Sequence, residues 1–131
     1  MKTLIVEDDY PSRFFLQNFL SRYGECDIAV NGKEALDAFR KAGDNGEPYN
    51  LICMDIMMPE MDGQEAVTQV RALEKASGIF PPHSVRIIMT TAVDDMKEVI
   101  RSFYELCDAY LTKPIDTDEM VRHLRSFELV D

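Results

Sequence analysis

The sequence lacks any long hydrophobic run. Its longest apolar stretch is only a few residues, too short for a helix that crosses a membrane. A signal peptide is also missing, because three acids (Glu7, Asp8 and Asp9) already follow the first six residues. Only three cysteines are present, far apart and without C-x-x-C spacing, which favours small buried hydrophobes in a reducing compartment over a redox or metal motif. We therefore expect a cytoplasmic protein.

Basic residues are scarce as well. There are 14 of them against 24 acids, which gives a net charge of −10, and the cations form no cluster. A chain of this charge is repelled by nucleic acid and by anionic membranes, so we expect neither as a partner.

Two common binding loops are also missing. No lysine-bearing glycine loop accompanies the acids at the amino terminus, and Asp94-Asp95 lacks the alternating acids and central glycine of an EF-hand.

What is present is a regular alternation of short apolar runs and longer amphipathic stretches. The chain has 131 residues, 46% of them apolar, which is enough for one domain over residues 1–131 with its own core. The apolar runs are four to six residues long or slightly shorter, as expected for strands covered on both faces. They are Thr3–Val6, Cys26–Val30, Leu51–Met54, Val85–Thr90 and Ala109–Leu111.

Each run is followed by a stretch with helical spacing. The first helix has Pro11 in its first turn and turns Phe15, Leu16, Phe19 and Leu20 inward. The others are expected from Gly32 to Ala42, after an N-cap at Asp62, from Asp94 or Asp95, and around Asp116 or Thr117. Five strands that each precede a helix predict an α/β fold, an open, doubly wound parallel sheet. The chain is too short for an eight-fold barrel.

Ligands bind such sheets at the carboxyl ends of the strands, so the residues there are candidate site residues. The first strand leads into Glu7 and Asp8, the third into Asp55, the fourth ends near Thr91, and the fifth leads into Lys113. Each has an ordinary structural explanation by itself, as a helix cap, a turn or a solvated strand end. Together they would bring carboxylates, a hydroxyl and an ammonium to one edge.

This combination suits Mg²⁺-assisted phosphoryl chemistry. Clustered carboxylates and backbone carbonyls form the oxygen-rich pocket that Mg²⁺ prefers. One carboxylate can accept a phosphoryl group as an aspartyl phosphate, while an ammonium and a hydroxyl neutralise the charge of its oxygens. The residues therefore predict a Mg²⁺-dependent phosphoryl acceptor.

At this point the sequence resembles a known family, the CheY-like receiver domain of bacterial two-component response regulators. The matching segments are Leu4–Asp9, Met54–Gly63, Met89–Ala92 and Tyr110–Pro114, in family order and over essentially the whole chain. The stretch Asp-x-x-Met-Pro-x-Met-Asp-Gly with a later Lys-Pro is the most specific of them. The resemblance implies a flavodoxin-like sheet with the strand order 2-1-3-4-5.

The resemblance also assigns the metal and phosphoryl positions. Asp55 corresponds to the phosphoacceptor. Asp8 corresponds to a direct Mg²⁺ ligand, Glu7 to an acid that holds the metal through water, and the Met57 carbonyl to the third protein ligand. Glu7 departs from the family, because CheY has an aspartate at this position.

The remaining roles concern the switch. Thr91 corresponds to the hydroxyl that moves to the phosphoryl oxygen, Lys113 to the ammonium that pairs with it, and Tyr110 to the aromatic residue whose rotation follows. The family has a cis peptide bond before the proline, here Lys113-Pro114, which the sequence permits. Asp9 lies one step beyond the metal pair, so we expect it to cap a helix.

The resemblance implies a signalling module rather than an enzyme with an external substrate. A sensor histidine kinase or a histidine phosphotransfer protein would supply the phosphoryl group, by contact around Pro11–Leu20. A downstream protein would bind the face formed by residues 94–127, and homodimer formation is left open. Three alternatives stay open: a receiver cut from a longer regulator, a Mg²⁺-dependent small-molecule phosphatase, and a scaffold that has lost the switch.

Overall fold

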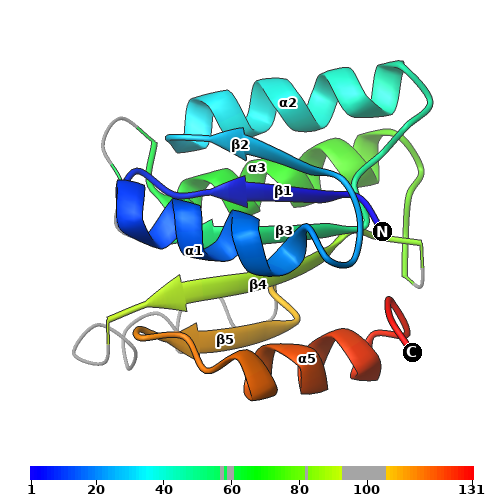
Figure 1. Cartoon of the computed structure of the whole chain (residues 1–131). Coiled ribbons are helices and arrows are strands. Elements are labelled where there is room, and N and C mark those ends of the chain that lie inside the picture. The colour runs from blue at the N-terminus through cyan, green and yellow to red at the C-terminus, as the bar shows by residue number, and fades with distance from the viewer. Residues whose placement is uncertain (57, 59–60, 82, 93–105) are drawn as a thin grey trace.

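The computed structural model describes residues 1–56, 58, 61–81, 83–92 and 106–131. Within these ranges strands and helices alternate along the chain (Figure 1). The strands are β1 (Thr3–Val6), β2 (Cys26–Ala29), β3 (Leu51–Asp55), β4 (Arg86–Thr91) and β5 (Ala109–Thr112). The helices are α1 (Tyr10–Leu20), α2 (Gly32–Asp44), α3 (Gly63–Ala76) and α5 (Thr117–Ser126). The helix predicted from Asp94 or Asp95 lies outside the described residues, and so does Met57.

The five strands form one parallel sheet in the order β2-β1-β3-β4-β5, which confirms the predicted topology. All arrowheads in Figure 1 point to the same edge. The chain leaves β1 for β2 and then returns to β3 on the other side of β1. This reversal opens the crevice in which doubly wound sheets bind their ligands.

Asx residues at the carboxyl edge of the sheet begin the described helices. Each accepts a hydrogen bond from a backbone N–H of the first turn and so satisfies a donor that the helix cannot. The caps are Asp9 for α1, Asn31 for α2, Asp62 for α3 and Asp116 for α5. The predicted caps at Asp9 and Asp62 are confirmed. Local sequence thus decides where the chain turns from strand to helix, directly beside the strand ends.

Two apolar cores cover the two faces of the sheet, because successive strand residues point to opposite sides. Leu4 and Ile52 face α2 and α3, whereas Ile5 and Cys53 face α1 and α5. β1 and β3 are buried throughout and β4 is buried from its second residue on, as the uninterrupted apolar runs predict. β2 differs, since only its Ala29 is fully buried. It forms the edge of the sheet, where cover on both faces is incomplete.

One residue of the predicted inner face of α1 is exposed. Leu16 and Leu20 are buried, Phe19 is half-buried, and Phe15 is 43% exposed. The prediction for Phe15 was wrong because Leu16 and Leu20, four residues apart, already occupy the stripe that faces the sheet. Phe15 lies beside this stripe.

A buried charge network lies at the amino ends of the strands, opposite the carboxyl ends that lead into the helices. Glu74, at the end of α3, is only 3% exposed and accepts hydrogen bonds from Arg71 Nη1 and from the Val85 N–H, both at 2.7 Å. Arg71 also donates to the Leu106 carbonyl at 2.9 Å and to Asp108 at 3.1 Å. The network joins α3 to the starts of β4 and β5, where the helix-to-strand connection is long.

The three cysteines are thiols that form no disulfide with one another. Cys53 is buried and Cys26 and Cys107 are half-buried, so the expected burial is confirmed in full only for Cys53. Burial raises the pKa of all three thiols, that of Cys53 to about 12. Within the described ranges, every helix is too short or too polar to cross a lipid bilayer.

Candidate functional site

The predicted site residues meet at one edge of the sheet. Asp55 ends β3, Thr91 ends β4, and Glu7 and Lys113 directly follow β1 and β5. Because all of these strands are parallel neighbours, their carboxyl ends lie side by side. The Lys113 N–H donates to the Thr91 carbonyl at 2.8 Å, which joins the carboxyl ends of β4 and β5. Residues more than 100 positions apart in the chain thus share one site.

Three carboxylates form the centre of the site. One oxygen from each of Glu7, Asp8 and Asp55 lies within 4.8 Å of the other two. Glu7 is fully buried, Asp55 is 6% exposed, and Asp8 faces solvent. A cation bound there would have carboxylate oxygens on the protein side and water on the other, which is how proteins hold Mg²⁺. The donor set therefore fits the metal that the sequence predicts.

The Lys113 ammonium lies against two of these acids. Its Nζ is 2.6 Å from Glu7 Oε1 and 3.5 Å from Asp55 Oδ2. Burial alone would lower the pKa of Lys113, but the hydrogen bond to Glu7 and the charge of Asp55 raise it overall. Lys113 therefore stays charged at neutral pH. Its direct contact with Glu7 could not be predicted from the sequence, since it depends on how the ends of β1 and β5 lie relative to each other.

Glu7 is held at both carboxylate oxygens. Oε1 accepts from Lys113 and Oε2 accepts from the Asp9 N–H at 3.3 Å. Burial, followed by the interaction with Asp55, raises the pKa of Glu7 from 4.5 to about 6, although Lys113 opposes the shift. The effects of burial and of the Asp55 charge on the pKa of Glu7 are thus larger than the opposite effect of the Lys113 ammonium. A bound metal cation would reduce the repulsion between the carboxylates.

Thr91 and Tyr110, the two residues predicted to act as the switch, lie in β4 and β5. Thr91 is buried, and its hydroxyl donates to the Ala92 carbonyl at 3.2 Å. Tyr110 pairs with Met89 and Thr91 pairs with Thr112, so the side chains of Tyr110 and Thr91 lie on the same face of the sheet. Tyr110 is half-buried there. The adjoining Lys113-Pro114 peptide bond is cis.

Gly63, which belongs to the quoted motif but was given no role, brings α3 close to Asp55. A Cβ on Gly63 would lie 2.3 Å from the Asp55 carbonyl oxygen, a distance that the backbone does not allow. The Gly63 N–H donates to the Ile56 carbonyl at 3.0 Å. The available signal was Asp62-Gly63, a helix cap followed by a residue without a side chain. Met57, whose carbonyl is the third expected ligand, lies outside the described residues.

The fold and this site define a class. An open parallel sheet of order 2-1-3-4-5, with carboxylates and a lysine at its switch point, is a flavodoxin-like α/β domain. The family model of the response regulator receiver domain matches residues 3–125. The chain therefore belongs to the response regulator receiver domain family, which gives it a phosphoacceptor role in signal transduction.

Similar proteins come from several kingdoms. Hybrid signal transduction histidine kinase B of Dictyostelium discoideum is 36% identical over 92% of this chain and 6% of its own length. The transcriptional regulatory protein PcoR of Escherichia coli is 31% identical over 95% of this chain and 50% of its own. This chain thus spans half or less of these two relatives.

Two solved receiver domains are similar to this chain over nearly its whole length. The receiver domain of the Saccharomyces cerevisiae response regulator Ssk1, crystallised with the histidine phosphotransfer protein Ypd1, has a TM-score of 0.82 at 29% identity, covering 97% of this chain and 88% of that one. The receiver domain of the Arabidopsis thaliana histidine kinase CKI1, crystallised with Mg²⁺ and BeF₃⁻, has a TM-score of 0.81 at 30% identity, covering 97% and 89%.

Proposed function

We propose that Asp55 is the phosphoacceptor of this receiver and that Mg²⁺ is its cofactor. Asp8 and Asp55 would bind the metal directly, with the Met57 carbonyl as third ligand and Glu7 acting through water. The observation that carries the proposal is the carboxylate cluster within 4.8 Å, with the Lys113 ammonium 3.5 Å from Asp55. When bound, Mg²⁺ neutralises charge on the phosphoryl oxygens.

Each of the site residues has a separate role in the phosphoryl transfer. An Asp55 oxygen attacks the phosphorus of a phosphohistidine, an O–P bond forms, and the P–N bond breaks with its electron pair returning to the imidazole. Lys113 exchanges part of its contact with the acids for a phosphoryl oxygen. Thr91 turns its hydroxyl from the Ala92 carbonyl to another phosphoryl oxygen, and Tyr110 on the same face follows. The domain acts in this way as a signalling module rather than as a small-molecule phosphatase.

Intact mass after incubation with acetyl phosphate tests the acceptor. We expect the wild type to gain one phosphoryl group only when Mg²⁺ is present, and Asp55→Asn to gain none. Asp37→Asn, which removes an exposed acid of α2, is the matched control and should be labelled like the wild type. Labelling of Asp55→Asn at the wild-type rate would refute the assignment.

The donor in this proposal is a histidine kinase or histidine phosphotransfer protein that covers the amino-terminal half of α1. Tyr10, Phe14 and Phe15 are 65%, 55% and 43% exposed there, and the rings of Tyr10 and Phe14 stack at 6.2 Å. A hollow of about 280 Å³ adjoins them and reaches the site. Its lining is Pro11, Ser12, Phe15, Lys113, Pro114 and Ile115. The complex of the Ssk1 receiver with Ypd1 supports a partner of this kind.

Two phosphoryl donors separate docking from chemistry. Phe14→Ala should slow transfer from a phosphorylated phosphotransfer protein, for which yeast Ypd1 is a practical probe. The same variant should react normally with acetyl phosphate, which needs no docking face. Equal loss with both donors would instead place Phe14 in the fold or in the chemistry.

The remaining partner assignments belong to the proposal as well. The downstream target would bind the face of residues 94–127, of which β5 and α5 are described here. The single-domain organisation over residues 1–131, the cytoplasmic location and homodimer formation stay predictions.

A further inference from the structure

Arg13 connects the exposed aromatic face of α1 to the acidic site. It lies one turn into α1 and is half-buried. Its Nη1 donates to the Glu7 carbonyl at 3.2 Å, and its guanidinium carbon lies 5.3 Å from the centroid of the Tyr10 ring. Arg13 lies within the expected contact range Pro11–Leu20, but none of the metal, phosphoryl or switch roles carried over from the receiver family falls on it.

The bond to the Glu7 carbonyl acts on the metal ligand next to it. That carbonyl belongs to the peptide group that joins Glu7 to Asp8. On its other side the Glu7 backbone is held by β2, since the Glu7 N–H donates to the Ala29 carbonyl at 3.0 Å. Arg13 thus fixes the peptide plane from which the exposed Asp8 projects. Groups that orient a metal ligand without touching the metal contribute to metal affinity.

The contact with Tyr10 links Arg13 to the exposed aromatic face of α1, which is where the partner is proposed to dock. Tyr10 is 65% exposed and stacked on Phe14, so a partner on this face covers the ring that faces Arg13. The attraction between a guanidinium and an aromatic ring strengthens when water is removed. A docked partner would therefore restrain Arg13, and with it the Glu7 carbonyl.

We propose that Arg13 is a positioning residue that couples occupation of the aromatic face of α1 to the geometry of Asp8, and so to Mg²⁺ affinity. The coupling rests on the proposed function, in which a phosphotransfer partner covers this face. Thermodynamic linkage makes it reciprocal: a partner that tightens Mg²⁺ binding is itself bound more tightly when Mg²⁺ is present.

Calorimetric titration with MgCl₂ tests the inference. We expect Arg13→Gln to bind Mg²⁺ about tenfold more weakly than the wild type. This is the lower end of the loss of affinity for residues that hydrogen-bond to metal ligands, because Arg13 bonds to a backbone carbonyl and not to a ligand side chain. Arg13→Lys should recover part of the loss. Tyr10→Leu should weaken binding about two- to threefold in the same direction, because it removes the aromatic contact of the guanidinium and leaves the bond to the Glu7 carbonyl.

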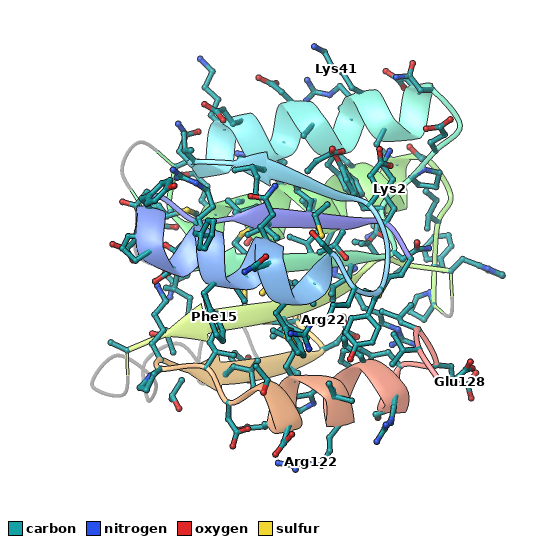
Figure 2. The ribbon with its side chains drawn as sticks, in the orientation of Figure 1. Lys2, Phe15, Arg22, Lys41, Arg122 and Glu128 are labelled. Carbon is teal, nitrogen blue, oxygen red and sulfur yellow. The ribbon has the colours of Figure 1, made fainter. Side chains whose placement is uncertain are left out.

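Arg22→Gln is the matched control. The guanidinium carbon of Arg22 lies 5.4 Å from the centroid of the Phe19 ring, a contact like that of Arg13. Arg22 is, however, beyond the carboxyl end of α1 and away from the carboxyl ends of the strands (Figure 2). Its Mg²⁺ affinity should stay within twofold of the wild type. The backbone amide signal of Asp8 gives a second readout, which should shift without Mg²⁺ in Arg13→Gln and not in Arg22→Gln.

Three outcomes would overturn the inference. They are an unchanged Mg²⁺ affinity of Arg13→Gln, an equal loss in Arg22→Gln, and absence of Mg²⁺ binding by the wild type. A wild type that binds Mg²⁺ but takes no phosphoryl group from acetyl phosphate would refute the proposed acceptor chemistry alone. If Arg13→Gln fails to fold, Tyr10→Leu still decides, because it keeps the guanidinium, and unchanged affinity there would refute the link to the docking face.

Discussion

Removal of the Glu7 charge should stabilise the metal-free protein at neutral pH. Glu7 is fully buried beside Asp55, and its pKa is raised from 4.5 to about 6. A carboxyl with a higher pKa in the folded than in the unfolded state makes the folded state bind more protons. The free energy of unfolding therefore falls as the pH rises from about 4.5 to 6, and the loss persists above that window.

The pKa shift sets the size of the effect. At about 1.4 kcal/mol per pKa unit, ionised Glu7 costs at most about 2 kcal/mol of stability at pH 7.5, and less than about 1 kcal/mol at pH 5. Water at the neighbouring Asp8 screens part of this repulsion, so we expect Glu7→Gln to be about 1–2 kcal/mol more stable than the wild type at pH 7.5. The amide keeps an oxygen that accepts a hydrogen bond from Lys113.

Urea unfolding without Mg²⁺, at both pH values, measures this difference. Glu25→Gln, a change at an exposed acid, is the control and should stay within about 0.5 kcal/mol of the wild type. Added Mg²⁺ should stabilise the wild type more than Glu7→Gln. A Glu7→Gln protein that is less stable than the wild type at pH 7.5 would refute the reasoning, because the ion pair with Lys113 would then outweigh the cost of burial.

Three further substitutions test the packing around the site and at the far edge. Gly63→Ala should destabilise the fold by about 1–3 kcal/mol in thermal or urea unfolding, because its Cβ would meet the backbone of β3. Gly43→Ala, in α2 with open space around it, should instead stabilise by up to about 1 kcal/mol, and a loss there would show that the glycine is needed. Glu74→Ala should cost about 3 kcal/mol, since Arg71 and the Val85 N–H lose their buried acceptor, and a cost below about 1 kcal/mol would show that water replaces it.

Most of the fold could be predicted because its signals are local. An apolar run such as Leu51–Met54 has no polar position to expose, which identifies a strand covered on both sides, and Asp62 marks a helix start by its hydrogen-bonding chemistry. The strand ends also predict which side chains share a site, since parallel strands end at one edge. Asp55 and Lys113 could therefore be placed together without coordinates.

What could not be predicted depends on packing between distant segments. Glu74, between Leu73 and Lys75, has the sequence context of a surface acid, and it is buried only because Arg71 and the start of β4 supply its hydrogen bonds. The 2.6 Å contact of Lys113 with Glu7 likewise depends on how the ends of β1 and β5 lie relative to each other. These contacts join residues from different segments, so no single stretch of the sequence predicts them.

The raised pKa values of the cysteines have a practical consequence for spectroscopy. A thiol reacts with maleimides and other electrophiles as its thiolate, so the native thiols should be slow to react at neutral pH. A cysteine placed in an open position, such as Gly43→Cys near the end of α2, could then carry a fluorescent dye without prior removal of the native ones. The chain has no tryptophan, so such a dye would give it an optical reporter at the end of the sheet opposite Glu7, Asp8 and Asp55.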